Sequence, residues 1–114
     1  MTTNRRWLSA WVALAVGIGI YAVIPGKVAD HVWQSGSIEH VWTFAALMAL
    51  APRAFPATER IRLAAGLAAA GVAIEIVQLA VPGRDFEWED LVADACGIGL
   101  GWALVALITG RRPR

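Results

Sequence analysis

The stretch IEIVQLAVPGRDFEWEDLVADACG, residues 74–97, decides the fold because it joins two long apolar runs through a short charged turn. Glu75 and Gln78 lie inside the first run, and Asp94 lies inside the second. The Pro-Gly pair between the runs is typical of a tight turn. The stretch therefore predicts a hairpin of two apolar helices that carry polar groups in their interiors.

The whole chain repeats this pattern of apolar runs. Of its 114 residues 58% are hydrophobic and 17% are charged, and the charged residues gather in clusters between the runs. A bilayer core requires about 17 to 25 apolar residues in each helix, so the pattern indicates a membrane protein. We predict an all-α, polytopic, four-transmembrane-helix bundle that forms one domain over residues 1–114. The expected helices are residues 7–25, 35–51, 63–82 and 89–109.

The distribution of basic residues predicts the orientation. Four helices place the two termini and the middle loop on one side, and most basic residues fall there: Arg5, Arg6, Arg53, Arg60, Arg62, Arg111, Arg112 and Arg114. The other side has only Lys27 and Arg84. By the positive-inside rule, both termini are expected to be cytoplasmic. The net charge is only +1 and no basic face is left, so we expect no nucleic-acid partner.

Polar side chains of three helices are expected at one depth. At a rise of about 1.5 Å per residue, Glu75 lies roughly 10 Å below the outer end of its helix, and Gln78 and Asp94 lie about 6 Å deep. His40 falls in the same layer. A charged carboxylate near the bilayer centre costs about 2.5 to 3.5 kcal/mol, and ionisable residues within membranes are usually functional. The sequence therefore predicts an outward-facing polar pocket.

Small residues accompany the acids on two helical stripes. Each stripe has the spacing 4, 3, 4: Gly71, Glu75, Gln78, Pro82 on one helix, and Asp90, Asp94, Gly97, Gly101 on the next. Small residues at this spacing let helices approach closely. We expect Gly71, Gly97 and Gly101 to be helix-packing positions, with the last helix packed against the third and its acids pointing into the bundle.

The same polar residues carry a family resemblance. The pattern is Glu75-x-x-Gln78, Val81-Pro82-Gly83-Arg84 and Asp90-Leu91-x-Ala93-Asp94-x-x-Gly97, with His40 ahead of it. This pattern resembles the VanZ-like family of small bacterial membrane proteins, over most of the chain.

The resemblance implies a four-helix protein of the bacterial cytoplasmic membrane and an association with low-level resistance to the glycopeptide teicoplanin. It also implies that the family's recurrent polar positions fall on His40, Glu75, Gln78, Arg84, Asp90 and Asp94. Asp94 stands where Asn is common in the family. The chain has Gly36-Ser37 where family members usually carry an Asp-Lys pair, so one salt-bridge candidate is missing.

The leading functional hypothesis is a binding protein of the cell envelope. Its pocket would hold the head group of a lipid-linked cell-wall precursor, or the glycopeptide itself. Arg84 would pair with phosphate or carboxylate, while Glu75, Gln78 and Asp94 would accept hydrogen bonds from amides or hydroxyls. We expect no cofactor and no metal, because the chain has no cysteine cluster and no paired-histidine motif.

Three alternatives remain open. In an enzyme acting on a lipid head group, His40, Glu75 and Asp94 would bind a metal or act as general acid and base. A proton- or ion-coupled carrier would use the two intramembrane acids and would require a homo-oligomer, because four helices alone make a poor conduit. In a scaffold, Glu75 would bond Gln78 and His40 or pair with Arg84, and these contacts would only lock the bundle.

Overall fold

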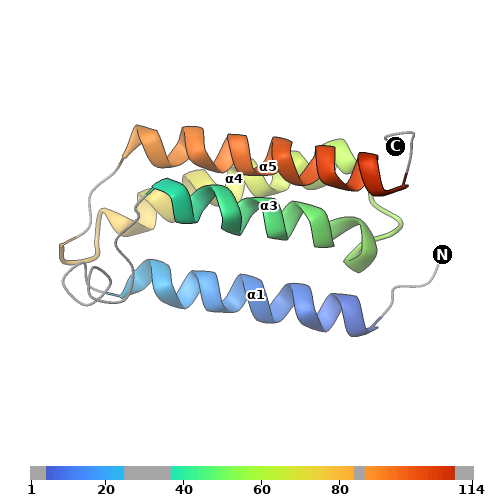
Figure 1. The fold of residues 1–114 in the computed structure, drawn as a ribbon. Coiled ribbons are helices and arrows are strands. Elements are labelled where there is room, and N and C mark those ends of the chain that lie inside the picture. The colour runs from blue at the N-terminus through green and yellow to red at the C-terminus, as the bar shows by residue number, and fades with distance from the viewer. Residues whose placement is uncertain (1–4, 25–36, 84–86, 110–114) are drawn as a thin grey trace.

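The computed structural model describes residues 5–24, 37–83 and 87–109, and over these residues the chain is helical, without strands. The four helices are α1 (Arg5–Val23), α3 (Ser37–Ala54), α4 (Arg60–Gln78) and α5 (Trp88–Thr109) (Figure 1). The predicted all-α class is confirmed. The observed helices begin and end within a few residues of the predicted bounds.

Three of the four described helices, α1, α4 and α5, are long and apolar enough to cross a membrane. The 18-residue α3 is not among them. Glu39 and His40 lie in its first turn, and Pro52 and Arg53 lie in its last turn, so its ends are polar. Sequence reasoning placed the end of this helix at residue 51, before Pro52, but the helix includes the proline and continues to Ala54.

The end of α4 lies earlier than predicted. Sequence reasoning extended the helix to residue 82, whereas α4 ends at Gln78 and the next three N–H groups donate to carbonyls three residues back. A residue that precedes proline is disfavoured in the helical conformation, and Pro82 follows directly. Gly83 then adopts a φ of 76°, which closes the turn. Glu75 therefore lies three residues from the end of its helix, shallower than predicted.

The core is centred on α3, which packs on α1, α4 and α5. Phe44, Leu47 and Met48 of α3 are buried with Leu67 of α4 and Ile98 of α5. The most extensive helix contact is between α3 and α5, and α5 also packs on α4, so the predicted contact between the last helix and the third apolar run is present but is not the main one.

Two glycines of α5 explain this choice of neighbour. A Cβ atom at Gly101 would lie 2.5 Å from the carbonyl oxygen of Ala45, and one at Gly97 would overlap the carbonyl oxygen of Val41. Both glycines thus let α5 approach the backbone of α3, as small residues do in membrane helix pairs.

Candidate functional site

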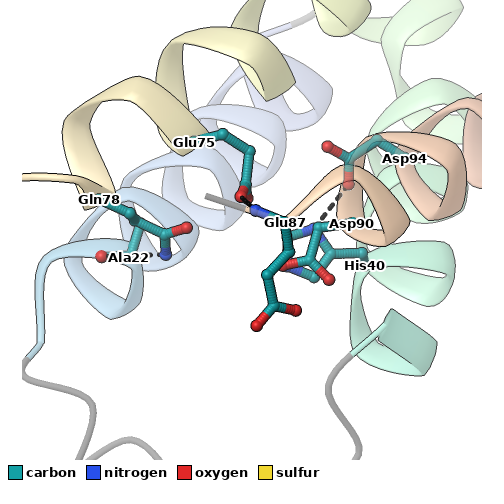
Figure 2. Close-up of polar contacts among 7 residues, drawn as sticks. All are labelled: Ala22, His40, Glu75, Gln78, Glu87, Asp90 and Asp94. Carbon is teal, nitrogen blue, oxygen red and sulfur yellow. Dashed lines mark hydrogen bonds and ion pairs between the residues drawn. The ribbon is translucent and has the colours of Figure 1, made fainter. Parts of the chain in front are cut away.

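Four ionisable side chains converge at one end of the bundle (Figure 2). His40 comes from the first turn of α3, Glu75 from the last turn of α4, and Asp90 and Asp94 from the first two turns of α5. These helices alternate in direction, so the beginnings of α3 and α5 meet the end of α4. The four residues, here called the polar cluster, lie at the end of the bundle opposite the start of α1 and the end of α5 (Figure 1).

His40 is held between two carboxylates of α5. Its Nδ1 donates to Oδ1 of Asp94 at 2.7 Å, and its Nε2 lies 3.4 Å from Oδ2 of Asp90. The ring also lies parallel to that of Phe44, one turn further along α3. A carboxylate on one ring nitrogen fixes the orientation of a histidine and leaves the other nitrogen for chemistry. In this site the nitrogen left for chemistry is Nε2.

Glu75 is fully buried, with an exposed fraction of 0%. Its Oε1 accepts from the backbone N–H of Glu87 at 2.9 Å, which ties the end of α4 to the start of α5. Its Oε2 is buried and has no hydrogen-bond partner among the described residues. A buried polar atom without a partner typically costs about 1 to 3 kcal/mol. One carboxylate oxygen of Glu75 is therefore available to a ligand.

Asp94 lies directly over Gly71 of α4. A Cβ atom at Gly71 would be 2.5 Å from Oδ2 of Asp94, and this oxygen is also buried without a partner among the described residues. The small residue predicted as a helix-packing position therefore makes room for a carboxylate. Gly71 and Glu75 are one turn apart on α4, so they form the wall of the cluster that faces α5.

Gln78 does not join the cluster, although sequence reasoning placed it in the same layer. Its Nε2 donates to the carbonyl oxygen of Ala22 at 3.2 Å, so the side chain is directed to α1 (Figure 2). The hydrogen bonds expected of the scaffold alternative, between Glu75 and Gln78, are replaced by the contacts of these residues with Glu87 and Ala22. Arg84 lies outside the described residues, and its role stays a prediction.

A cavity of about 390 Å³ lies between α1, α3 and α4, beside the cluster. Its wall is mostly apolar, with polar contributions from Tyr21, Glu39, His40, Thr43 and Gln78. His40 belongs to both the cavity wall and the polar cluster. Sequence reasoning missed the contribution of α1, because its lining residues apart from Tyr21 are ordinary small and aliphatic ones that carry no signal of a site.

The polar cluster also has the composition of a metal site. His40, Glu75 and Asp90 each offer one ligand atom, and these three atoms lie within 4.8 Å of one another. Imidazole nitrogen and carboxylate oxygen are common ligands of divalent metals. The expectation of no metal rested on the absence of a local motif. These ligands come from three helices, so no local spacing reveals them.

Three helices with membrane-spanning length and composition, packed with α3 around buried ionisable groups, define a small polytopic membrane protein. The family model described as VanZ/LLP1 matches residues 3–109, nearly the whole chain, and the chain belongs to this family. The resemblance seen in the sequence is confirmed. Comparison with curated proteins and with solved structures gives no match.

Proposed function

We propose that this VanZ-family protein binds an amphiphile of the bacterial cell envelope. The apolar part would lie in the cavity between α1, α3 and α4, and the polar head group would meet His40 and Gln78. The observation that carries the proposal is the double position of His40, on the cavity wall and in the polar cluster. A volume of about 390 Å³ and an apolar wall with a few polar groups are typical of small-molecule sites.

The polar groups favour a head group that donates hydrogen bonds. Three of the four cluster residues are acids, and Glu39 adds a further carboxyl group to the cavity wall. Hydroxyl and amide groups would satisfy these acceptors. A lipid-linked cell-wall precursor offers such a head group on an apolar chain, and the cavity would hold one part of that chain. The precursor is therefore the ligand we propose first, and glycopeptide binding is the second.

The distribution of arginines supports a location in the cytoplasmic membrane with both termini inside. In that orientation the polar cluster lies near the outer surface, because it is at the opposite end of the bundle from the start of α1 and the end of α5. A head group on the outer leaflet would then reach the site directly.

A cavity-filling substitution tests this proposal. Gly17 lines the cavity, and a Cβ atom there meets no described residue within 4 Å, so Gly17→Phe fills the cavity without a clash at the helix surface. Gly19 is equally open, lies on the same helix and is outside the cavity wall, so Gly19→Phe is the matched control. Native mass spectrometry of the purified protein should find bound lipid in the wild type and in Gly19→Phe, and not in Gly17→Phe. Equal lipid binding by both variants would contradict the proposal.

The pairing of His40 with Asp94 supports a second candidate, catalysis on the same head group. A base whose ring is oriented by a carboxylate is a common part of enzyme sites. His40 would then take a proton from water or from a head-group hydroxyl. Release of the head group from lipid-linked precursor in vesicles, lost in His40→Ala, would support this candidate. If the wild-type protein binds the lipid-linked precursor but does not release its head group, binding without catalysis is favoured.

A further inference from the structure

We propose that the polar cluster binds one divalent transition-metal ion. His40 Nε2 and one carboxylate oxygen each from Glu75 and Asp90 would be the ligands, and Asp94 would be a positioning residue that orients His40. This inference goes beyond amphiphile binding and does not depend on it.

The distance between His40 and Asp90 fits a shared metal ion. Two ligand atoms, each about 2.0 to 2.2 Å from a tetrahedral zinc ion, lie roughly 3.3 to 3.5 Å from each other. The observed separation of Nε2 and Oδ2 is 3.4 Å, which is long for a direct hydrogen bond between a nitrogen and a carboxylate oxygen. Nδ1 already donates to Asp94, so a protonated ring forms an ion pair with Asp90 through Nε2, whereas a neutral ring, the form that binds a metal, directs a lone pair at the Asp90 carboxylate. A cation between these two atoms removes their repulsion.

The burial of Glu75 supplies independent support. Its side chain is fully buried, and its Oε2 has no hydrogen-bond partner among the described residues. One of its oxygens lies within 4.8 Å of the ligand atoms of His40 and Asp90. Burying a carboxylate with one oxygen left without a hydrogen bond is costly, and the neighbouring acids of α5 increase the cost. A divalent cation bound by a carboxylate oxygen of Glu75 would compensate this charge.

Asp94 has the position of the group that orients a metal-binding histidine in known metal sites. A histidine that binds a metal usually donates its other ring N–H to a carboxylate or carbonyl, which fixes its tautomer and ring orientation. The 2.7 Å bond from His40 Nδ1 to Asp94 has this arrangement. Gly71 leaves the space for Asp94, so the orienting group is itself held by the packing of α4 against α5.

The ligand set indicates the class of metal. One imidazole with two carboxylates suits zinc or manganese, since imidazole favours zinc and carboxylates suit the harder ions. Three protein ligands leave a fourth position for water or for an oxygen of a head group, as in zinc sites that carry out chemistry.

Cobalt titration of the full chain in detergent micelles tests this site. After treatment with a chelator, the wild-type protein should bind one equivalent of Co²⁺ with visible absorption bands, and Zn²⁺ should displace it. His40→Ala, Glu75→Gln and Asp90→Asn should each abolish saturable binding. Asp94→Asn should weaken it by about 10- to 100-fold, as loss of an orienting group does.

Glu89→Gln is the matched control, because it removes one negative charge from an exposed side chain in the same turn of α5. It should bind Co²⁺ like the wild type. Circular dichroism identifies any variant that fails to fold. A further test uses nuclear magnetic resonance of the wild-type protein alone. Paramagnetic broadening of the His40 ring signals by Co²⁺ is expected, and its absence would overturn the proposal. Unchanged Co²⁺ affinity in a folded His40→Ala variant would also overturn it.

Discussion

The carboxylate of Asp94 occupies the space that a side chain on Gly71 would need. A Cβ atom at position 71 would lie 2.5 Å from Oδ2 of Asp94, closer than real Cβ contacts allow. Asp94 in turn holds His40 through a 2.7 Å hydrogen bond. A glycine of α4 thereby sets, through Asp94 of α5, the position of a histidine on α3.

Gly71→Ala should therefore disturb both the packing and the site. The added methyl group forces Asp94 to move, and overpacking of this kind typically costs about 1 to 3 kcal/mol in the free energy of unfolding. Gly66→Ala is the control on the same helix, because its Cβ meets no atom within 4 Å in the described part of the chain. Gly66→Ala should be neutral or should stabilise by up to about 1 kcal/mol, through helix propensity. Denaturation in detergent measures both, and equal stability of the two variants would contradict the role of Gly71.

Gly97 and Gly101 of α5 should be still less tolerant, because they contact backbone atoms that cannot rotate away. Gly101→Ala would place a methyl group 2.5 Å from the carbonyl oxygen of Ala45, so α5 must separate from α3. We expect a loss of about 1 to 3 kcal/mol or more in the free energy of unfolding. Gly99→Ala, whose Cβ has no neighbour within 4 Å among the residues that the structure describes, should not destabilise the protein. Similar losses for both variants would indicate that helix contacts are not the cause.

Gln78 should matter for α1 rather than for the polar cluster. The carbonyl of Ala22 is near the end of α1, where the last four carbonyls lack partners within the helix, and Gln78 satisfies it. Gln78→Leu leaves this carbonyl without its donor and should destabilise by about 1 to 3 kcal/mol. Val77→Leu, at a position 49% exposed, is the control. Co²⁺ affinity should stay unchanged in Gln78→Leu, and its loss would place Gln78 in the cluster after all.

Trp11 should contribute to stability through its indole N–H. Its Nε1 donates to the carbonyl oxygen of Leu47 at 3.0 Å, and its ring meets that of Phe55 edge to face. Trp11→Phe keeps an aromatic ring but removes the donor, which should lower the free energy of unfolding by about 0.5 to 1.5 kcal/mol. Trp42→Phe, at a position 62% exposed, should change stability less. The reverse order would show that the bond does not stabilise the bundle.

The sequence predicts the helices of this protein well because membrane helices require long apolar runs, which can be identified directly in the sequence. It singles out His40, Glu75 and Asp94 for a related reason, since an ionisable residue in an apolar run is easily noticed. Asp90 precedes its apolar run and is named through the family resemblance. The residues at which helices end are harder to predict from the sequence. Glu75 lies closer to a helix end than predicted, because Pro82 acts on the residue before it and ends the regular helix early.

The choice of helix neighbours could not be predicted from stripe spacing. The spacing of small and acidic residues on α5 identifies one face of that helix. It does not identify the helix that packs against this face. Gly97 and Gly101 contact α3, while Asp94 on the same stripe reaches Gly71 of α4. The hydrogen bond from the backbone N–H of Glu87 to Glu75 could not be predicted either, because every residue except proline has a backbone N–H.

The melting temperature of Glu75→Gln most directly tests whether the polar cluster serves a ligand or only the fold. The amide oxygen of glutamine can still accept from the N–H of Glu87, while the buried charge disappears. A ligand site commonly reduces stability for the sake of function, so removing its unpartnered carboxylate should leave the melting temperature of the ligand-free protein equal or higher. If the melting temperature instead falls by several degrees, the cluster locks the helices together and the ligand site is contradicted.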